Sequence, residues 1–458
     1  MKTTCYFIIS FFSFLAANLQ AQTYTQTTVV TGMSYPVAFA IAPDGRFFCT
    51  QKGGNSDPAV NAQIKVYNST GTYLGVFYDL TDSVDADFER GLLGIELDPN
   101  FTTNHWLYVY YVHLWNSDER IRIVRFTENN NVGTNPRIIF DFNVPDNLPG
   151  NHFGGNLHFN HTDTTHLYFT IGDFAINQTV PAQNYGQDTT VPFGKTNRIF
   201  KYPVNYNPAS NWSANIPTDN PFYDDGDPTT GACDLIWSYG HRNPFDFCFS
   251  PITDTMYVSE NGLNTWDEVN VIHRGGNYGW AYCEGDYLNS STTSPCNNPA
   301  YINPITEWGA PLGGITGIVY YTGPVMPEFD DHLLVADNDY GRVFDITLGN
   351  SPAFDMATSN VLWMDMTTSG GLTTLREGSD GCIYAMKGGY TTNGQIYRVC
   401  PQGLGTEDFE NPVFGLQQNA PNPFSESTVI KYNMKQAAQA KIVIYDIFGR
   451  EVAVLADG

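Results

Sequence analysis

Residues 166–173 read HLYFTIGD, a short apolar and aromatic run that ends in glycine and aspartate. Similar runs recur at spacings of 50 to 89 residues, which leaves enough chain for a four-stranded sheet with insertions. The six runs are Phe47–Cys49, Leu107–Val109, Leu167–Phe169, Met256–Val258, Leu333–Val335 and Ile383–Ala385. Sheets stacked around an axis leave only short, protected edges. The repeat therefore predicts an all-β, six-bladed β-propeller, and a β-sandwich of similar strands is the alternative.

Polar residues directly follow three of these runs. Gly172 and Asp173 follow the third run, residues 260–262 (ENG) follow the fourth, and residues 337–339 (DND) follow the fifth. If the six strands are equivalent, their ends lie on one face of the propeller around its axis. We therefore expect polar side chains that are distant in the sequence to meet over the central channel.

The composition agrees with a large all-β protein. Aromatic residues make up 14% of the chain, and 42 glycines and 27 prolines are present. Aromatic side chains favour strands, while glycine and proline favour turns. The formal net charge of −25 argues against nucleic acid or an anionic membrane surface as a partner, because their phosphates would be repelled. A neutral ligand or bound cations fit this charge better.

The N-terminus has the pattern of an export signal. Lys2 precedes a mostly apolar run from Cys5 to Ala17, and small residues follow around Ala21. The run is short for a membrane span, and no later segment is a candidate for one. We therefore expect residues 1–21 to be removed and the protein to be secreted or held at the cell surface. The propeller is expected over residues 22–402, with a linker over 403–415 and a second domain over 416–458.

An exported chain can keep disulfides, and seven cysteines remain beyond the signal. Cys283 and Cys296 close one polar loop and form the best candidate pair. Two further pairs, Cys382–Cys400 and Cys233–Cys248, are also expected, which leaves Cys49 as the odd thiol. No CxxC or His/Cys cluster indicates zinc.

Four stretches are too polar and too rich in glycine for ordinary propeller strands. They are residues 89–94 (ERGLLG), 152–155 (HFGG), 239–244 (YGHRNP) and 260–280, which holds DEVN and GGNYGW. A histidine flanked by glycines allows close approach of a ligand, and His152 can act as a general base near neutral pH. Asp173 is placed to orient that imidazole if the hairpin pairs as expected. The Arg242 guanidinium suits a carboxylate partner.

Together these stretches resemble the soluble glucose/sorbosone dehydrogenases, six-bladed propellers that bind pyrroloquinoline quinone (PQQ) and calcium. The GLLG, HxGG, GD, GHRNP, DExN and GGNYGW elements occur in the family's order, and the match runs from about Val37 to Val399. The resemblance implies a PQQ-dependent oxidoreductase that converts the anomeric CH–OH group of a small neutral aldose sugar to a lactone. An electron acceptor, which the sequence does not identify, is a further expected partner.

The resemblance also implies roles for single residues. His152 would be the general base, Asp173 would hold it, and Arg242 would stabilise charge on the quinone. The implied cofactor contacts are Glu89 on the substrate side, Arg242, Asn243, Asn261, Thr316 and Arg376. The implied calcium ligands are the carbonyls of Gly262 and Leu263 at the cofactor, and Glu268 with the carbonyl of Tyr278 at a second, structural site.

Two positions depart from the family pattern. Glucose-oxidising members carry a lysine on the fifth blade, where this chain has the acidic residues 337–339, and a second arginine near Arg376, where this chain has Thr373. Losing cations and gaining acids weakens the binding of a tricarboxylate such as PQQ. Lys52 or Lys387, each just after a repeat strand, could compensate, although a rim or surface position is the simpler interpretation of both.

These departures keep a second class of function open. It is a calcium-stabilised propeller without cofactor that binds carbohydrate or protein, as the hedgehog-interacting protein does. Retention of His152, Asp173, Arg242 and Asn243 together favours the enzyme. A hydrolase has little support, because neither paired carboxylates nor a nucleophile elbow is present.

The tail from Leu416 onward differs from the rest of the chain. It contains the turn sequence NAPNPF at residues 419–424, followed by alternating segments over 429–432 and 441–445. These features resemble the C-terminal sorting domain of the type IX secretion system of Bacteroidetes, which would make that machinery a partner. The resemblance covers about the first half of such a domain, so we expect a truncated, β-sandwich-like module.

Overall fold

The computed structural model describes residues 23–54, 60–115, 118–145, 148–201, 212–366 and 371–402, and in the tail residues 414–416, 429, 432–434, 441–445 and 451–457. The predicted signal over residues 1–21 and most of the predicted linker lie outside the described residues. None of the described helices is long and apolar enough to cross a bilayer. Residues Thr25–Cys400 form one compact unit.

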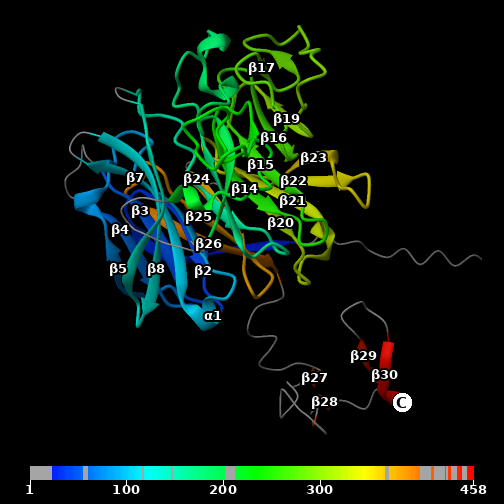
Figure 1. The fold of residues 1–458 in the computed structure, drawn as a ribbon. Coiled ribbons are helices and arrows are strands. Elements are labelled where there is room, and N and C mark those ends of the chain that lie inside the picture. Colours follow the sequence, from blue (N-terminus) through cyan, green and yellow to red (C-terminus); the bar gives the residue numbers. More distant parts are fainter. Residues whose placement is uncertain are drawn as a thin grey trace, which may run out of the picture. The chain divides into compact units, whose positions relative to one another are not determined.

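This unit is a six-bladed β-propeller of antiparallel four-stranded sheets, as the repeat predicted (Figure 1). Blade 1 holds β2 (Pro36–Ile41), β3 (Phe47–Lys52), β4 (Ala62–Tyr67) and β5 (Tyr73–Asp79); blade 2 holds β6 (Leu92–Leu97), β7 (Trp106–Trp115), β8 (Asp118–Asn129) and β9 (Val132–Asn143). Blade 3 holds β10 (Leu157–Phe159), β11 (His166–Ile171), β12 (Lys195–Phe200) and β13 (Ile236–Tyr239); blade 4 holds β14 (Pro244–Phe249), β15 (Met256–Glu260), β16 (Trp266–Ile272) and β19 (Thr306–Gly309). Blade 5 holds β20 (Ile315–Tyr321), β21 (His332–Asp337), β22 (Arg342–Gly349) and β23 (Met356–Asp365); blade 6 holds β24 (Leu372–Glu377), β25 (Ile383–Lys387), β26 (Gly394–Pro401) and β1 (Tyr24–Met33).

Blade 6 joins the two ends of the propeller. Its three inner strands come from the C-terminal part, and β1 at the N-terminus adds the fourth by pairing with β26. A sheet made from both chain ends closes the ring by hydrogen bonds. The first strands of the blades, β2, β6, β10, β14, β20 and β24, contact one another around the axis and line the central channel.

The shorter elements lie in the connections. They are η1 (Thr81–Ser83), α1 (Phe101–Asn104), η2 (Pro181–Gln183), η3 (Tyr185–Gln187), η4 (Trp212–Asn215), η5 (Pro327–Phe329) and the hairpin of β17 (Cys283–Glu284) with β18 (Tyr287–Leu288). The tail contributes two strand pairs, β27 (Phe414–Leu416) with β28 (Tyr432–Met434) and β29 (Lys441–Tyr445) with β30 (Glu451–Asp457). The strand expected over 441–445 is present as β29, and Tyr432, the last residue of the segment expected over 429–432, is the first residue of β28.

All six repeated runs are the second strands of their blades: β3, β7, β11, β15, β21 and β25. A second strand has hydrogen-bonded neighbours on both sides and a blade against each face. In β3 and β15 every residue is buried, which explains the continuous apolar sequence. The turns before three of these strands hold Gly45, Asp254 and Gly381 at φ of 84°, 59° and 72°, a region that glycine and aspartate tolerate.

The apolar core lies between neighbouring blades. One cluster joins blades 2 and 3, where the rings of Phe140 and Phe169 lie 4.9 Å apart, and others join blades 1 and 2 and blades 4 and 5. Stacked sheets with interdigitating side chains hold the channel-lining strands at fixed positions.

The cysteines follow the prediction in two of three pairs. Disulfides join Cys283 to Cys296 and Cys382 to Cys400, and Cys49 is a buried free thiol. The predicted Cys233–Cys248 bond is wrong, since both thiols are free. Cys233 belongs to the core between blades 2 and 3, whereas Cys248 on β14 packs against the core between blades 4 and 5, so the two face different layers.

Candidate active site

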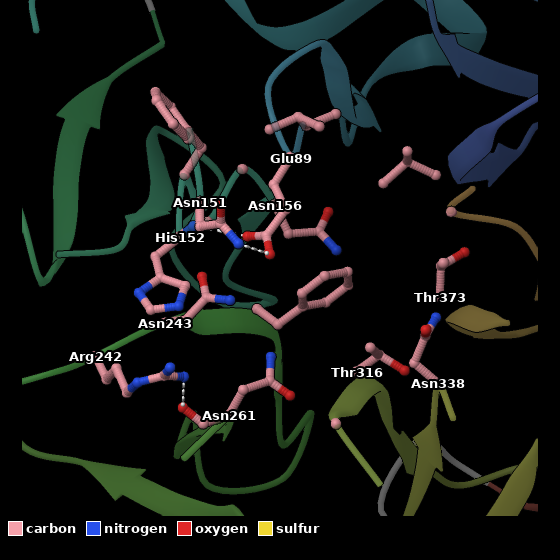
Figure 2. Close-up of a pocket in the computed structure, with 18 of the residues that line it drawn as sticks. Glu89, Asn151, His152, Asn156, Arg242, Asn243, Asn261, Thr316, Asn338 and Thr373 are labelled. Atoms are coloured by element: carbon pink, nitrogen blue, oxygen red, sulfur yellow. Dashed lines mark hydrogen bonds between the residues drawn. The ribbon is translucent and has the colours of Figure 1, made fainter. Parts of the chain in front are cut away.

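A cavity of about 430 Å³ opens at one end of the central channel. Every blade contributes a residue from the start of its first strand or just before it: Val37, Leu93, Asn156, Phe245, Thr316 and Thr373. The residues after β15 and β21 also line it, as expected from the polar ends of those strands. Figure 2 shows Glu89, His152, Arg242, Asn243 and Asn261 gathered on one side and Thr316, Asn338 and Thr373 on the other.

The central feature is a pair formed by His152 and Asp173. The His152 Nδ1 atom lies 2.6 Å from Asp173 Oδ1, and Asp173 is fully buried. The same carboxylate accepts hydrogen bonds from the Ala175 amide (2.8 Å), Asn184 Nδ2 (2.7 Å) and Trp280 Nε1 (2.7 Å). Burial alone would raise the pKa of Asp173, but the hydrogen bond and charge of His152 hold that pKa below its usual value. With Asp173 ionised, the proton between the two groups lies on Nδ1, and in the neutral imidazole Nε2 then carries the lone pair.

Glu89 holds the backbone of the His152 loop. Its Oε2 accepts the His152 amide at 2.6 Å, and its Oε1 accepts Asn151 Nδ2 at 3.1 Å (Figure 2). His152 has a φ of 59°, a left-handed conformation that a non-glycine residue adopts only when it is held there. A Cβ on Gly172 would come within 2.2 Å of the His152 carbonyl oxygen, so this approach needs glycine. Glu89 also lines the cavity. The sequence predicted a contact on the substrate side for Glu89, and the structure shows in addition that it supports the His152 loop.

Arg242 is buried and oriented by two acceptors. Its Nε donates to Gln178 Oε1 at 2.8 Å, and its Nη1 donates to the Asn261 carbonyl at 3.0 Å. The guanidinium carbon lies 5.6 Å from the centre of the Trp280 ring. Burial lowers the pKa of Arg242 although nearby carboxylates, Asp173 first among them, raise it. The result is a fixed positive charge beside the His152–Asp173 pair.

Three buried polar atoms in the cavity lack a hydrogen-bond partner among the described residues. They are Asn243 Oδ1, Asn261 Oδ1 and Thr373 Oγ1. Leaving a buried polar atom unpaired costs about 1–3 kcal/mol. Three such atoms around one cavity indicate that it receives a polar ligand.

The loop at the start of β16 is shaped by two carboxylates that the sequence interpretation did not select. Glu284 Oε1 accepts the backbone amides of residues 263–266 at 2.8 to 3.1 Å. Asp267 accepts the amides of Gly262, Gly313 and Gly314 at 2.9 to 3.1 Å, and burial raises its pKa to about 6. Asp267 lies in the DExN motif, which was the available signal; nothing in the sequence marked Glu284.

These amide contacts also orient the carbonyls expected to bind calcium. In a trans peptide the C=O of one residue and the N–H of the next point in opposite directions. Because the amides of Leu263 and Asn264 point to Glu284, the carbonyls of Gly262 and Leu263 point away from it. Gly262 and Leu263 both line the cavity, and backbone carbonyl oxygens are among the ligands that a hard cation prefers.

Glu268 and Tyr278, the expected second calcium site, lie outside the cavity in blade 4. Glu268 is paired in register with Glu260 and accepts Asn270 Nδ2 and the Gly285 amide, each at 2.8 Å. Burial and the neighbouring Glu260 raise the pKa of Glu268 well above its usual value. Tyr278 stacks its ring on His241 with 4.6 Å between ring centres. The close pair of buried carboxylates fits either a shared proton or a cation.

Arg376 is not part of this site. It lies at the opposite end of the channel, in a second cavity of about 570 Å³, where its Nη1 donates to Asp246 Oδ2 at 3.1 Å. There His158 lies between two carboxylates, Glu96 (2.5 Å) and Asp246 (3.0 Å). The structure therefore does not place Arg376 where the expected cofactor contact requires it. Thr373, near the start of β24, lines the first cavity, and Arg376, three residues later, lines the second.

The far side of the first cavity carries no arginine or lysine on blades 5 and 6 among the described lining residues. Asn338, Asp339 and Thr373 line it instead, and the Thr316 hydroxyl donates to the Leu372 carbonyl at 2.8 Å. Lys52 also lines the cavity, and the interpretation of Lys52 as a rim or surface lysine is wrong. It is 4% exposed, and its Nζ donates to the carbonyls of Ala86 (2.7 Å) and Phe88 (2.8 Å).

Comparison with known proteins identifies the family of the chain. A family model described as Glucose / Sorbosone dehydrogenase matches residues 33–398. The aldose sugar dehydrogenase YliI of Escherichia coli is 24% identical over 81% of this chain and 91% of its own length. Quinoprotein glucose dehydrogenase B of Acinetobacter calcoaceticus is 27% identical over 63% of this chain and 58% of its own length. The PQQ-bound form of aldose sugar dehydrogenase from Streptomyces coelicolor shares the fold, with a TM-score of 0.60, 21% identity, and coverage of 82% of this chain and 99% of its own.

The family model covers residues of all six blades and leaves out most of β1 and the end of β26. The six channel-lining strands and the His152 loop all lie inside the matched region. The chain belongs to the glucose/sorbosone dehydrogenase family.

Proposed function

We propose that this protein oxidises the anomeric hydroxyl of aldose sugars to lactones, with PQQ and Ca²⁺ bound in the first cavity. The observation that carries the proposal is the His152–Asp173 pair, set beside a fixed cation and three unpaired buried polar atoms. Membership of the family supports a sugar dehydrogenase, and the neutral sugar agrees with the chain's net charge of −25.

The residues present fit the cofactor on one side of the cavity. Arg242 would pair with a carboxylate or quinone oxygen, and the unpaired Oδ1 atoms of Asn243 and Asn261 would accept from an N–H or O–H group of the ligand. The unpaired Thr373 hydroxyl lies on the other side and could donate to a carboxylate there. The carbonyls of Gly262 and Leu263 would hold Ca²⁺. On the far side the lining is neutral (Asn338, Thr373) or acidic (Asp339), so the cofactor's other carboxylates would be held more weakly than by cations.

The chain's own residues perform the proton chemistry. PQQ with Ca²⁺ would supply a two-electron acceptor for the hydride of the anomeric carbon. His152 Nε2 removes the hydroxyl proton as the C–H bond breaks, and the ionised Asp173 stabilises the imidazolium that results. Glu89 keeps His152 at its position, and Arg242 provides positive charge where negative charge develops.

Further parts of the proposal concern the rest of the protein. Glu268, with the carbonyl of Tyr278, would bind a second, structural calcium, which the buried Glu260–Glu268 pair and the unpaired Asn270 Oδ1 support. The signal-like N-terminus and the tail support export through the type IX machinery. An external acceptor, small molecule or protein, would reoxidise the cofactor.

The test adds PQQ and Ca²⁺ to the purified chain and follows dye reduction with several aldoses. Activity is expected, and His152→Ala should lower turnover by at least a hundredfold while PQQ remains bound. Absence of both PQQ binding and dye reduction would instead favour a propeller that only binds carbohydrate or protein. The neutral and acidic far side of the cavity is the observation in favour of that second candidate.

A further inference from the structure

Two aromatic side chains stand exposed beside the catalytic loop. Tyr390 lines the cavity, yet 64% of its surface is exposed, and Phe88, next to Glu89, is 57% exposed. Phe88 lies in the connection that enters β6, the first strand of blade 2, and Tyr390 lies in the connection that follows β25, the second strand of blade 6. First strands begin at the cavity and second strands end there, so both residues lie on the cavity's side of the propeller. Aromatic rings left in solvent at the mouth of a cavity mark a surface that a ligand covers.

Lys52 contacts the backbone of Phe88 and the ring of Tyr390. Its Nζ donates to the Phe88 carbonyl at 2.8 Å and lies 5.2 Å from the centre of the Tyr390 ring. The ammonium group covers one face of Tyr390 and leaves the opposite face to solvent. The two aromatic residues therefore keep a fixed relation to each other and to Glu89 between them.

The backbone at Phe88 is held in a conformation that bulky residues rarely adopt. Its φ is 48°, in the left-handed region. The ring packs at Gly150, where an added Cβ would meet Phe88 Cδ2 at 2.9 Å, and Gly150 is two residues before His152. A strained backbone that keeps an apolar ring in solvent, rather than turning it into the core, is the kind of feature retained for binding.

We propose that Phe88 and Tyr390 form a saccharide subsite, so that the substrate is the reducing end of an oligosaccharide. This proposal rests on the proposed function, because it places the reacting sugar at His152. A second pyranose linked to that sugar must extend outward, past the mouth. Its C–H face would pack on the aromatic rings, and its hydroxyls would meet Glu89, Asn151 and the Tyr390 hydroxyl.

Two measurements on the purified full chain test the subsite. The first is calorimetric binding of reduced oligosaccharides such as maltotriitol and cellotriitol, which have no anomeric hydroxyl and need no turnover. The second is the ratio of kcat/KM for maltose or cellobiose to that for glucose, in protein loaded with PQQ and Ca²⁺. The variants are Tyr390→Ala, Tyr390→Trp, and Phe88→Asn, which suits a left-handed backbone. Tyr73→Ala is the matched control, because Tyr73 on β5 is a tyrosine of similar exposure (50%) on an outer strand.

We expect Tyr390→Ala and Phe88→Asn each to weaken binding of the reduced oligosaccharide about tenfold and to lower the disaccharide-to-glucose ratio by a similar factor. Tyr390→Trp should restore both, and Tyr73→Ala should change neither. Equal losses with glucose and disaccharides, or undiminished binding in both variants, would overturn the subsite without touching the proposed oxidation. If no sugar is oxidised but the reduced oligosaccharide binds in a Tyr390-dependent way, the subsite stands and the proposed function falls.

Discussion

Replacing Asp173 by asparagine tests the catalytic pair most directly, because the structure determines which way the new amide must face. The Oδ2 position of Asp173 accepts two donors, Asn184 Nδ2 and Trp280 Nε1, both at 2.7 Å. If the amide nitrogen faced them, two buried donors would be unpaired, at about 1–3 kcal/mol each. With the NH₂ group on the Oδ1 side only one backbone donor, the Ala175 amide, loses its acceptor. The amide oxygen therefore takes the Oδ2 side, with a net preference of roughly 1–3 kcal/mol, and the NH₂ group faces His152.

An NH₂ group at that position donates to His152 Nδ1, which must then accept. The proton moves to Nε2, and the nitrogen that faces the sugar can no longer take a proton. We expect turnover to fall about 10³- to 10⁴-fold, the scale known when the orienting aspartate of a catalytic triad becomes asparagine. Steady-state dye reduction at saturating PQQ, Ca²⁺ and sugar measures the effect, and PQQ binding should be kept.

The matched control is Asp345→Asn. The pair of His332 Nδ1 and Asp345 Oδ1 has the same 2.6 Å distance but lies on blade 5, away from the cavity. This control should keep wild-type turnover. A turnover of Asp173→Asn above about a tenth of wild type would refute the assignment of His152 as the base. The reason is that an amide oxygen that accepts from Trp280 Nε1 leaves the NH₂ group facing His152 Nδ1, which puts the imidazole proton on Nε2.

Three further predictions concern Trp280, Glu89 and His158. Trp280→Phe keeps an aromatic ring near the guanidinium but removes one donor to the charged Asp173, so kcat should fall about ten- to a hundredfold; an unchanged kcat would mean that this hydrogen bond has no role. Glu89→Ala leaves the His152 amide unpaired, and we expect at least about tenfold lower kcat with a lower melting temperature, checked by calorimetry against wild type. At the other cavity, two carboxylates raise the pKa of His158 despite burial and a neighbouring guanidinium, so its stabilising effect is complete below the unfolded pKa of about 6.5 and is lost as the pH rises through the higher folded pKa. The wild-type melting temperature should therefore fall more between about pH 6.5 and 9 than that of His158→Gln, and parallel curves would contradict the assignment.

The propeller could be predicted from the sequence because its second strands are buried on both faces. Such strands must be continuously apolar, which leaves a repeat such as Leu107–Val109 or Met256–Val258 that insertions do not erase. The pairing of His152 with Asp173 could also be predicted from the sequence, since Gly172 and Asp173 directly follow β11 and His152 stands among glycines that the close backbone approach requires.

Other parts of the site depended on the tertiary structure. The channel has two ends, and a strand that lines it reaches both: Thr373 faces one cavity and Arg376 the other, although only three residues separate them. Sequence spacing does not report the position along the axis at which a side chain points inward. Sequence spacing also does not report which layer between blades a side chain enters. Cys233 and Cys248 are close in sequence but pack in different layers.

The sequence by itself determined the six sheets, their order and the residue types that meet at the axis, because strand burial and turn chemistry are local properties of the chain. Only the tertiary structure decided which partners each of these residues has. It placed Trp280 on Asp173, Glu89 on the His152 amide and Lys52 beneath Tyr390, contacts that join residues 63 to 338 positions apart. The physical reason is that the ring closes through blade packing, so the contacts between one blade and the next are set by the geometry of the whole assembly of sheets.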